Sequence, residues 1–195
     1  MTLVKMLISR FAKEPAFTSR DAAVFFRKEG VSPAYRNLLL HKLVKQGELF
    51  PITKGVYTFR QEMQAVGFAF QPFYYGLQDA LSLRNLWEQE TAPVVITPRR
   101  VRTGVRKFLG NNYVVKRIDR KMFFGFSLLK YGDFWVPVSD AEKTLIDLVH
   151  FRQPVSEEAL AGIKKAIRKE VLEEYLKRVP ERLAERMREK LKMKK

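Results

Sequence analysis

The chain has 195 residues, of which 37 are Lys or Arg and 21 are Asp or Glu, giving a formal net charge of +16 at pH 7. A cationic excess this large predicts a polyanionic partner, either nucleic acid or an anionic membrane. The absence of Cys and the presence of only two His exclude disulfides and thiol catalysis and leave little room for a metal site. We therefore expect no metal and no cofactor.

The first segment, MTLVKMLISRF, is interrupted by Lys5 and Arg10 and has no small-residue cleavage site after it. It predicts an amphipathic helix and not a signal peptide. No stretch of the chain approaches the roughly 18 apolar residues that a membrane span needs. We expect a cytoplasmic protein with no membrane partner.

Two further helices are predicted between residues 18 and 47. Thr18, with Asp21 three positions later, approximates a capping box, and Gly30 suits the end of that helix. Ser32-Pro33 is a cap followed by proline at the first position of the next helix, which Gly47 ends. Two helices joined by a tight turn that contains Gly form a helix-turn-helix pattern.

A short hairpin is predicted after these helices, in the sequence GELFPITKGVYTF. Lys54-Gly55 supplies the tight turn, with apolar residues before and after it. The order of three helices and a hairpin resembles a winged helix-turn-helix domain, which we assign to residues 1–60.

A recognition helix places its N-terminal side chains in the major groove, and Arg and Asn can each read a base through paired hydrogen bonds. The candidate DNA contacts on this helix are its polar residues Ser32, Tyr35, Arg36, Asn37, His41, Lys42 and Lys45. Lys54 at the wing tip suits a contact to phosphate. The expected partner is double-stranded DNA.

The middle of the chain, residues 61–155, predicts an α+β domain with an antiparallel sheet. Short strands are expected at 93–97 and 111–118, and a hairpin over 122–138. Ser139 and Glu142 form an S-x-x-E capping box that opens a helix with Leu145 and Ile146 on its buried side.

The order of these motifs is similar to that of the AbiEi-type antitoxins, which are transcriptional regulators of type IV toxin–antitoxin and abortive-infection systems. The pieces that carry the resemblance are the winged helix, YYGLQDALSLRNL from Tyr74, PVVIT, FFGF and VSDAEKTLIDL from Val138. It covers residues from about 15 to 155. The resemblance implies a repressor of its own operon that counters a nucleotidyltransferase-like toxin.

Asp140, Glu142, Lys143 and Asp147 favour an alternative, a metal-dependent nucleic-acid-processing enzyme, because such sites need converging carboxylates, often beside a lysine. Asp140 and Glu142 fall in the first turn of the predicted helix, where acids satisfy free amides. Asp147 lies near the opposite side of that helix. We therefore expect structural roles for these acids, no catalytic residues and no enzymatic activity. A stand-alone architectural DNA-binding protein is the other alternative.

Residues 99–121 contain nine basic side chains and a single acid, Asp119. Such an imbalance favours a second phosphate-binding surface over a face of ion pairs. The members that we expect to contact DNA are Arg99, Arg100, Arg102, Arg106 and Lys107. A contact with an acidic protein is the alternative.

The last segment, residues 156–195, is rich in Glu, Lys and Arg. Its apolar positions predict one amphipathic helix of about seven turns up to Val179, which Pro180 ends or kinks. We expect a basic helical extension that packs on its own chain, on a second copy or on a partner.

Overall fold

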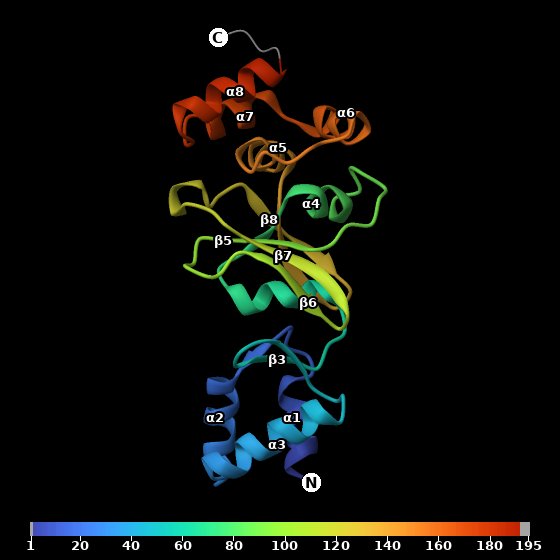
Figure 1. The fold of residues 1–195 in the computed structure, drawn as a ribbon, viewed down its shortest axis with the longest axis vertical. Helices are drawn as coiled ribbons and strands as arrows, with labels where there is room; N and C mark the ends of the chain where they lie inside the picture. Colours follow the sequence, from blue (N-terminus) through green and yellow to red (C-terminus); the bar gives the residue numbers. More distant parts are fainter. Residues whose placement is uncertain (1, 192–195) are drawn as a thin grey trace. The chain divides into compact units, whose positions relative to one another are not determined.

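The computed structural model describes residues 2–191 and divides the chain into two compact units (Figure 1). Unit 1 comprises residues 1–71 with 107–111, and unit 2 comprises 72–106 with 112–195. Within residues 2–191 no helix has the length and apolar character required to cross a membrane.

Unit 1 consists of three helices and a small antiparallel sheet of order β1-β3-β2. The helices are α1 (Leu3–Phe11), α2 (Ser19–Lys28) and α3 (Pro33–Lys45), and the strands are β1 (Phe17–Thr18), β2 (Phe50–Thr53) and β3 (Val56–Thr58). Residues Met63–Phe70 form the 3-10 helix η1. This order of elements confirms the predicted winged helix-turn-helix architecture.

Local signals begin and end these helices as predicted. Thr18 and Asp21 form a reciprocal capping box at the start of α2, and Ser32 caps α3, whose first residue is Pro33. Gly55 in the turn between β2 and β3 has a φ of +75°, which favours glycine. Nine buried residues, from the three helices, β1 and the segment just before β2, then form one core: Leu7, Phe11, Phe17, Ala22, Phe26, Leu39, Leu40, Leu43 and Leu49.

Unit 2 is built on a six-stranded sheet of order β6-β7-β5-β4-β9-β8. The strands are β4 (Tyr74–Tyr75), β5 (Val94–Thr97), β6 (Gly104–Phe108), β7 (Asn111–Arg117), β8 (Phe126–Tyr131) and β9 (Phe134–Ser139). The predicted α+β class is confirmed, but the sheet is mixed and not wholly antiparallel. β5 pairs with β7 in parallel, and β4 pairs with β9 in parallel. Because the chain turns back through β6 before β7, β7 runs in the direction of β5.

Five α-helices of unit 2 gather on one face of this sheet (Figure 1). They are α4 (Leu77–Leu83), α5 (Ala141–His150), α6 (Glu157–Ala166), α7 (Lys169–Leu176) and α8 (Glu181–Leu191), and the 3-10 helix η2 (Arg120–Met122) precedes β8. α5 contacts each of the other four helices. Its Leu145 and Ile146 belong to the core that joins the helices to Tyr74 and Ile96 of the sheet.

The cap of α5 differs from the predicted one. Asp140, and not Ser139, is the N-cap, and its carboxylate accepts a hydrogen bond from the Lys143 amide at 2.8 Å. Ser139 is the last residue of β9, and its hydroxyl is 2.7 Å from that of Thr144. The strand therefore extends one residue further than the motif suggests, and the next acid takes the capping position.

The single helix predicted up to Val179 is wrong, because the chain breaks between α6 and α7. Ile167 and Arg168 have extended backbone angles, with ψ of 131° and 115°. The backbone N–H and the Nε of Arg168 both donate to Oε1 of the buried Glu142, at 2.8 and 3.1 Å. The Arg168 amide therefore donates to a distant carboxylate, whereas in a continuous helix it would bond to a carbonyl of that helix.

Candidate nucleic-acid interface

α3 has a buried side and an exposed side, as a recognition helix requires. Leu39, Leu40 and Leu43 lie in the core of unit 1. The predicted contact residues Ser32, Tyr35, Asn37, His41, Lys42 and Lys45 are exposed. The structure thus brings these six side chains to the accessible surface of one helix.

Arg36 is half-buried, unlike the other polar residues of α3. It precedes Leu40 by four residues and Leu43 by seven, so it projects from the side of the helix that faces the core. Its guanidinium reaches out to its neighbour, and Nε and Nη2 donate to Oδ1 of Asn37 at 3.1 and 3.0 Å. Arg36 and Asn37 therefore form one hydrogen-bonded pair.

The wing turn is held against the start of α2. The Ser19 amide donates to the Gly55 carbonyl at 2.8 Å, and β1 pairs with β3 beside it. A Cβ on Gly55 would lie 3.2 Å from the Ser19 hydroxyl, a close approach that also favours glycine there. Lys54 is exposed beside this fixed turn, at the position predicted for a phosphate contact.

A search for polar residues alone misses Leu38, the side chain at the centre of the exposed side of α3. Leu38 is 62% exposed, and Ala34, one turn before it, is also exposed. The helical period was the available signal, because positions 34, 38, 41 and 45 share the side opposite the buried leucines.

The basic cluster of residues 99–121 is divided in space. Arg99, Arg100 and Arg102 lie in the loop between β5 and β6, whereas Arg106 and Lys107 lie in β6. Arg99 and Arg100 line a pocket of about 540 Å³ together with Pro98, Arg117, Ile118, Asp119 and Arg120. The Asp119 carboxylate accepts the Lys121 amide at 2.8 Å as the cap of η2.

The other three predicted contacts, Arg102, Arg106 and Lys107, do not line this pocket, and neither does Lys116. Arg106 Nη2 donates to the Arg102 carbonyl at 2.7 Å. Lys116 is half-buried, with its ammonium 5.0 Å from the centre of the Phe151 ring. The pocket thus brings together four basic residues of the stretch, Arg99, Arg100, Arg117 and Arg120, with Asp119.

The acids of α5, which favoured the alternative of an enzyme, have structural partners. Asp147 is buried, forms an ion pair with Lys143, and accepts a hydrogen bond from the Tyr74 hydroxyl at 2.7 Å. Burial raises the pKa of Asp147 and lowers the pKa of Lys143, and the attraction within the pair opposes both shifts.

The carboxylates of Asp140 and Glu142 also have hydrogen-bond partners within the fold. Asp140 caps α5 and accepts from the Tyr175 hydroxyl at 2.8 Å, and Glu142 binds Arg168. Burial raises the pKa of Asp140, and it would also raise that of Glu142, but the hydrogen bonds from Arg168 bring the pKa of Glu142 below its usual value. Within residues 2–191 no cluster of three or more His, Cys, Asp or Glu is placed to hold a metal ion.

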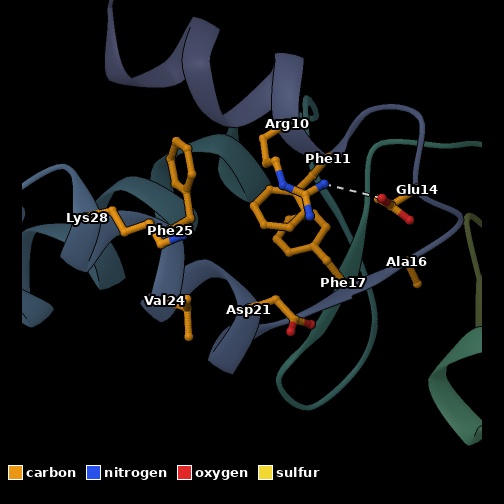
Figure 2. Close-up of a pocket in the computed structure, with 9 residues that line it drawn as sticks. All are labelled: Arg10, Phe11, Glu14, Ala16, Phe17, Asp21, Val24, Phe25 and Lys28. Carbon is orange, nitrogen blue, oxygen red and sulfur yellow. Dashed lines mark hydrogen bonds and ion pairs between the residues drawn. The ribbon is translucent and has the colours of Figure 1, made fainter.

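A hollow of about 570 Å³ lies between α1 and α2 in unit 1. Figure 2 shows the side chains that line it. The rings of Phe11 and Phe17 stack within it at a centroid distance of 4.4 Å. Its two acids have local partners, because Glu14 pairs with Arg10 at 3.2 Å and Asp21 forms the capping box of α2 with Thr18. None of the predicted DNA contacts lines this hollow.

A comparison with known proteins finds a family match within unit 1, the unit that contains α3. Residues 6–60 match the family described as transcriptional regulator, AbiEi antitoxin. No curated protein matches the chain. The matched segment contains α2, α3 and the wing, so the predicted resemblance is confirmed there, and its extension to residue 155 stays a prediction. Residues 6–60 are therefore a domain of the AbiEi antitoxin family of transcriptional regulators.

Proposed function

We propose that the chain is a sequence-specific DNA-binding repressor of its own operon. The observation that carries this proposal is the exposed side of α3, which presents polar and basic residues in a domain of a regulator family that also has a wing. An α-helix fits the major groove, where each base pair has a distinct pattern of donors and acceptors. Unit 1 supplies such a helix with its buried side anchored by three leucines.

The exposed residues divide by chemistry. The Arg36–Asn37 pair near the N-terminus of α3 carries groups that hydrogen-bond base edges. Lys42, Lys45 and Lys54 are flexible point charges that suit phosphate oxygens. In this proposal the pair selects sequence and the lysines fix the position of the domain on the duplex.

We propose that the basic residues of the middle region extend this footprint. Arg99, Arg100, Arg102, Arg106 and Lys107 lie in a stretch with nine cations and one acid, and the pocket formed by four arginines has room for a phosphate group. Residues 1–60 would then read the DNA, residues 61–155 would form the antitoxin domain, and residues 156–195 would be its helical extension.

We further propose that the chain counters a nucleotidyltransferase-like toxin. The support for this role is the family match over residues 6–60. The test is to express a nucleotidyltransferase encoded beside this gene with and without the full chain. Restored growth supports the antitoxin role, and persistent growth arrest contradicts it without affecting the proposal of DNA binding.

Binding of the full chain to the DNA upstream of its own gene tests the repressor role. We expect affinity at least a thousandfold higher for this DNA than for random duplex at the same salt concentration. Equal affinity for both would favour an architectural DNA-binding protein. Cleavage of either DNA that depends on Mg²⁺ would favour the nucleic-acid-processing enzyme.

A further inference from the structure

α3 exposes two large hydrophobic side chains, and the more exposed of them is Leu38. Leu38 is 62% exposed and Tyr35 is 49% exposed. A single exposed leucine is unremarkable on an ordinary protein surface. Leu38, however, lies at the centre of the side of α3 that the proposed function brings to the DNA.

The surroundings of Leu38 point to a nucleic-acid ligand with an apolar group. Ala34 precedes Leu38 by one helical turn, so the two methyl-bearing side chains form a short apolar strip. Exposed His41, Lys42 and Lys45 continue the same helix. A strip of this kind among cations matches a polyanion that also presents an apolar group.

The major groove of DNA offers one apolar group on its base edges, the 5-methyl group of thymine. Leucine can neither donate nor accept a hydrogen bond, so it cannot distinguish bases through their polar groups. We propose that Leu38 reads a thymine by packing against its 5-methyl group, with Ala34 widening the same apolar surface. This inference rests on the proposed function, because it assumes that α3 enters the major groove.

The decisive probe is a duplex recovered by the full chain from a randomised DNA pool. Each thymine of this duplex is replaced in turn by deoxyuridine, which removes only the methyl group. At the thymine that contacts Leu38 the affinity of the wild-type chain should fall about fourfold, which corresponds to the burial of one methyl group. The dependence of affinity on salt should stay the same, because no charge changes.

Leu38→Ala supplies the other half of the test. The variant should bind the thymine duplex more weakly, and its affinity should be the same for thymine and deoxyuridine at that position. Leu38→Met, which keeps an apolar side chain of similar volume, should retain the preference for thymine. Leu128→Ala is the matched control, because Leu128 is also 62% exposed but lies in β8 of unit 2.

Each outcome has a distinct meaning. If no thymine position responds to the loss of its methyl group, or if Leu38→Ala keeps the wild-type response, the assignment of Leu38 is overturned while sequence-specific binding stands. If the pool yields no preferred sequence at all, the proposed function itself fails. Equal unfolding midpoints for the wild type and Leu38→Ala exclude a general loss of structure.

Discussion

α3 and α5 are both capped helices with charged residues, yet they use those charges in opposite ways. α3 buries three leucines and leaves Lys42 and Lys45 exposed. α5 buries nine consecutive residues, and its Lys143 and Asp147 neutralise each other inside the core. The difference shows that a cluster of charged residues indicates a binding site only where the fold leaves the charges without internal partners.

The largest expected effect comes from breaking the buried pair of α5. Lys143→Met leaves the Asp147 carboxylate buried without its cation, and we expect a loss of about 3–5 kcal/mol in the free energy of unfolding. Urea denaturation followed by tryptophan fluorescence reports on this region, because Trp87 and Trp135 both lie in unit 2.

The double variant Lys143→Met with Asp147→Asn provides the control. It removes both charges but keeps an acceptor for the Tyr74 hydroxyl, so it should be more stable than Lys143→Met alone. On α3, Lys42→Met and Lys45→Met should each change stability by less than about 0.5 kcal/mol. A similar loss for all three single Lys→Met variants would contradict the contrast between the two helices.

Asp79 of α4 extends the contrast to a buried acid without a cation. It is 2% exposed and accepts a hydrogen bond from the Val94 amide at 3.1 Å, and burial raises its pKa to about 7. A carboxyl whose pKa is raised on folding stabilises the folded state while it is protonated, and this stability is lost as the pH rises towards 7. From pH 5 to pH 8 we expect a loss of about 3 kcal/mol.

Asp79→Asn isolates this contribution from that of the other acids. The variant keeps an oxygen that can accept the Val94 amide but no longer titrates. The difference in stability between wild type and variant, measured with the same tryptophan signal, should therefore shift in favour of the variant as the pH rises from 5 to 7 and level off above pH 7. A difference that stays constant from pH 5 to pH 8 would show that Asp79 has an ordinary pKa.

The features predicted from the sequence are local ones. The Thr18–Asp21 capping box, the Ser32-Pro33 start of α3 and the Lys54-Gly55 turn each depend on residues within three positions. Parallel pairing of β5 with β7 and the break at Arg168 depend on contacts across the fold. The carboxylate that holds that break, Glu142, is 26 residues away. No local pattern carries such a contact, so the mixed sheet and the split helix escaped prediction.

The candidate site shows the same limit within a single helix. Side-chain polarity identified six residues of α3 that prove to be exposed, but it treated Arg36 as their equal and passed over Leu38. Arg36 shares the side of Leu40 and Leu43, and only the length of its side chain brings the guanidinium to Asn37. The exposure of a side chain on α3 depends on its position around the helix, so residue type alone could not predict it.

The Arg36–Asn37 pair offers a test of readout with an intermediate effect. Arg36→Ala and Asn37→Ala should each weaken binding to the preferred DNA by about 1–3 kcal/mol and affect random DNA much less. Because the two side chains bond each other, the double variant should lose less than the sum of the single losses. Fluorescence anisotropy titrations at one salt concentration measure all four chains, and equal losses on both DNAs would assign the pair to phosphate contacts or to the fold.

The smallest expected effect concerns the basic residues of unit 2. The test is whether their charges are free to bind DNA, as proposed for α3, or serve the fold, as in α5. Among residues 2–191, no acidic side chain forms an ion pair with Arg100 or Arg102. If both contact phosphates, the change of both to Gln should reduce the slope of log affinity against log salt by about 0.9 per contact and leave base preference intact.

The matched control is Lys164→Gln with Lys165→Gln, which removes the same charge from the exposed surface of α6. A slope reduced equally by both pairs would indicate an effect of net charge, and an unchanged slope in the arginine variant would show that this loop does not touch DNA. A slope reduced by the arginine variant alone would show that the charges of this loop, like those proposed for α3, bind an external polyanion.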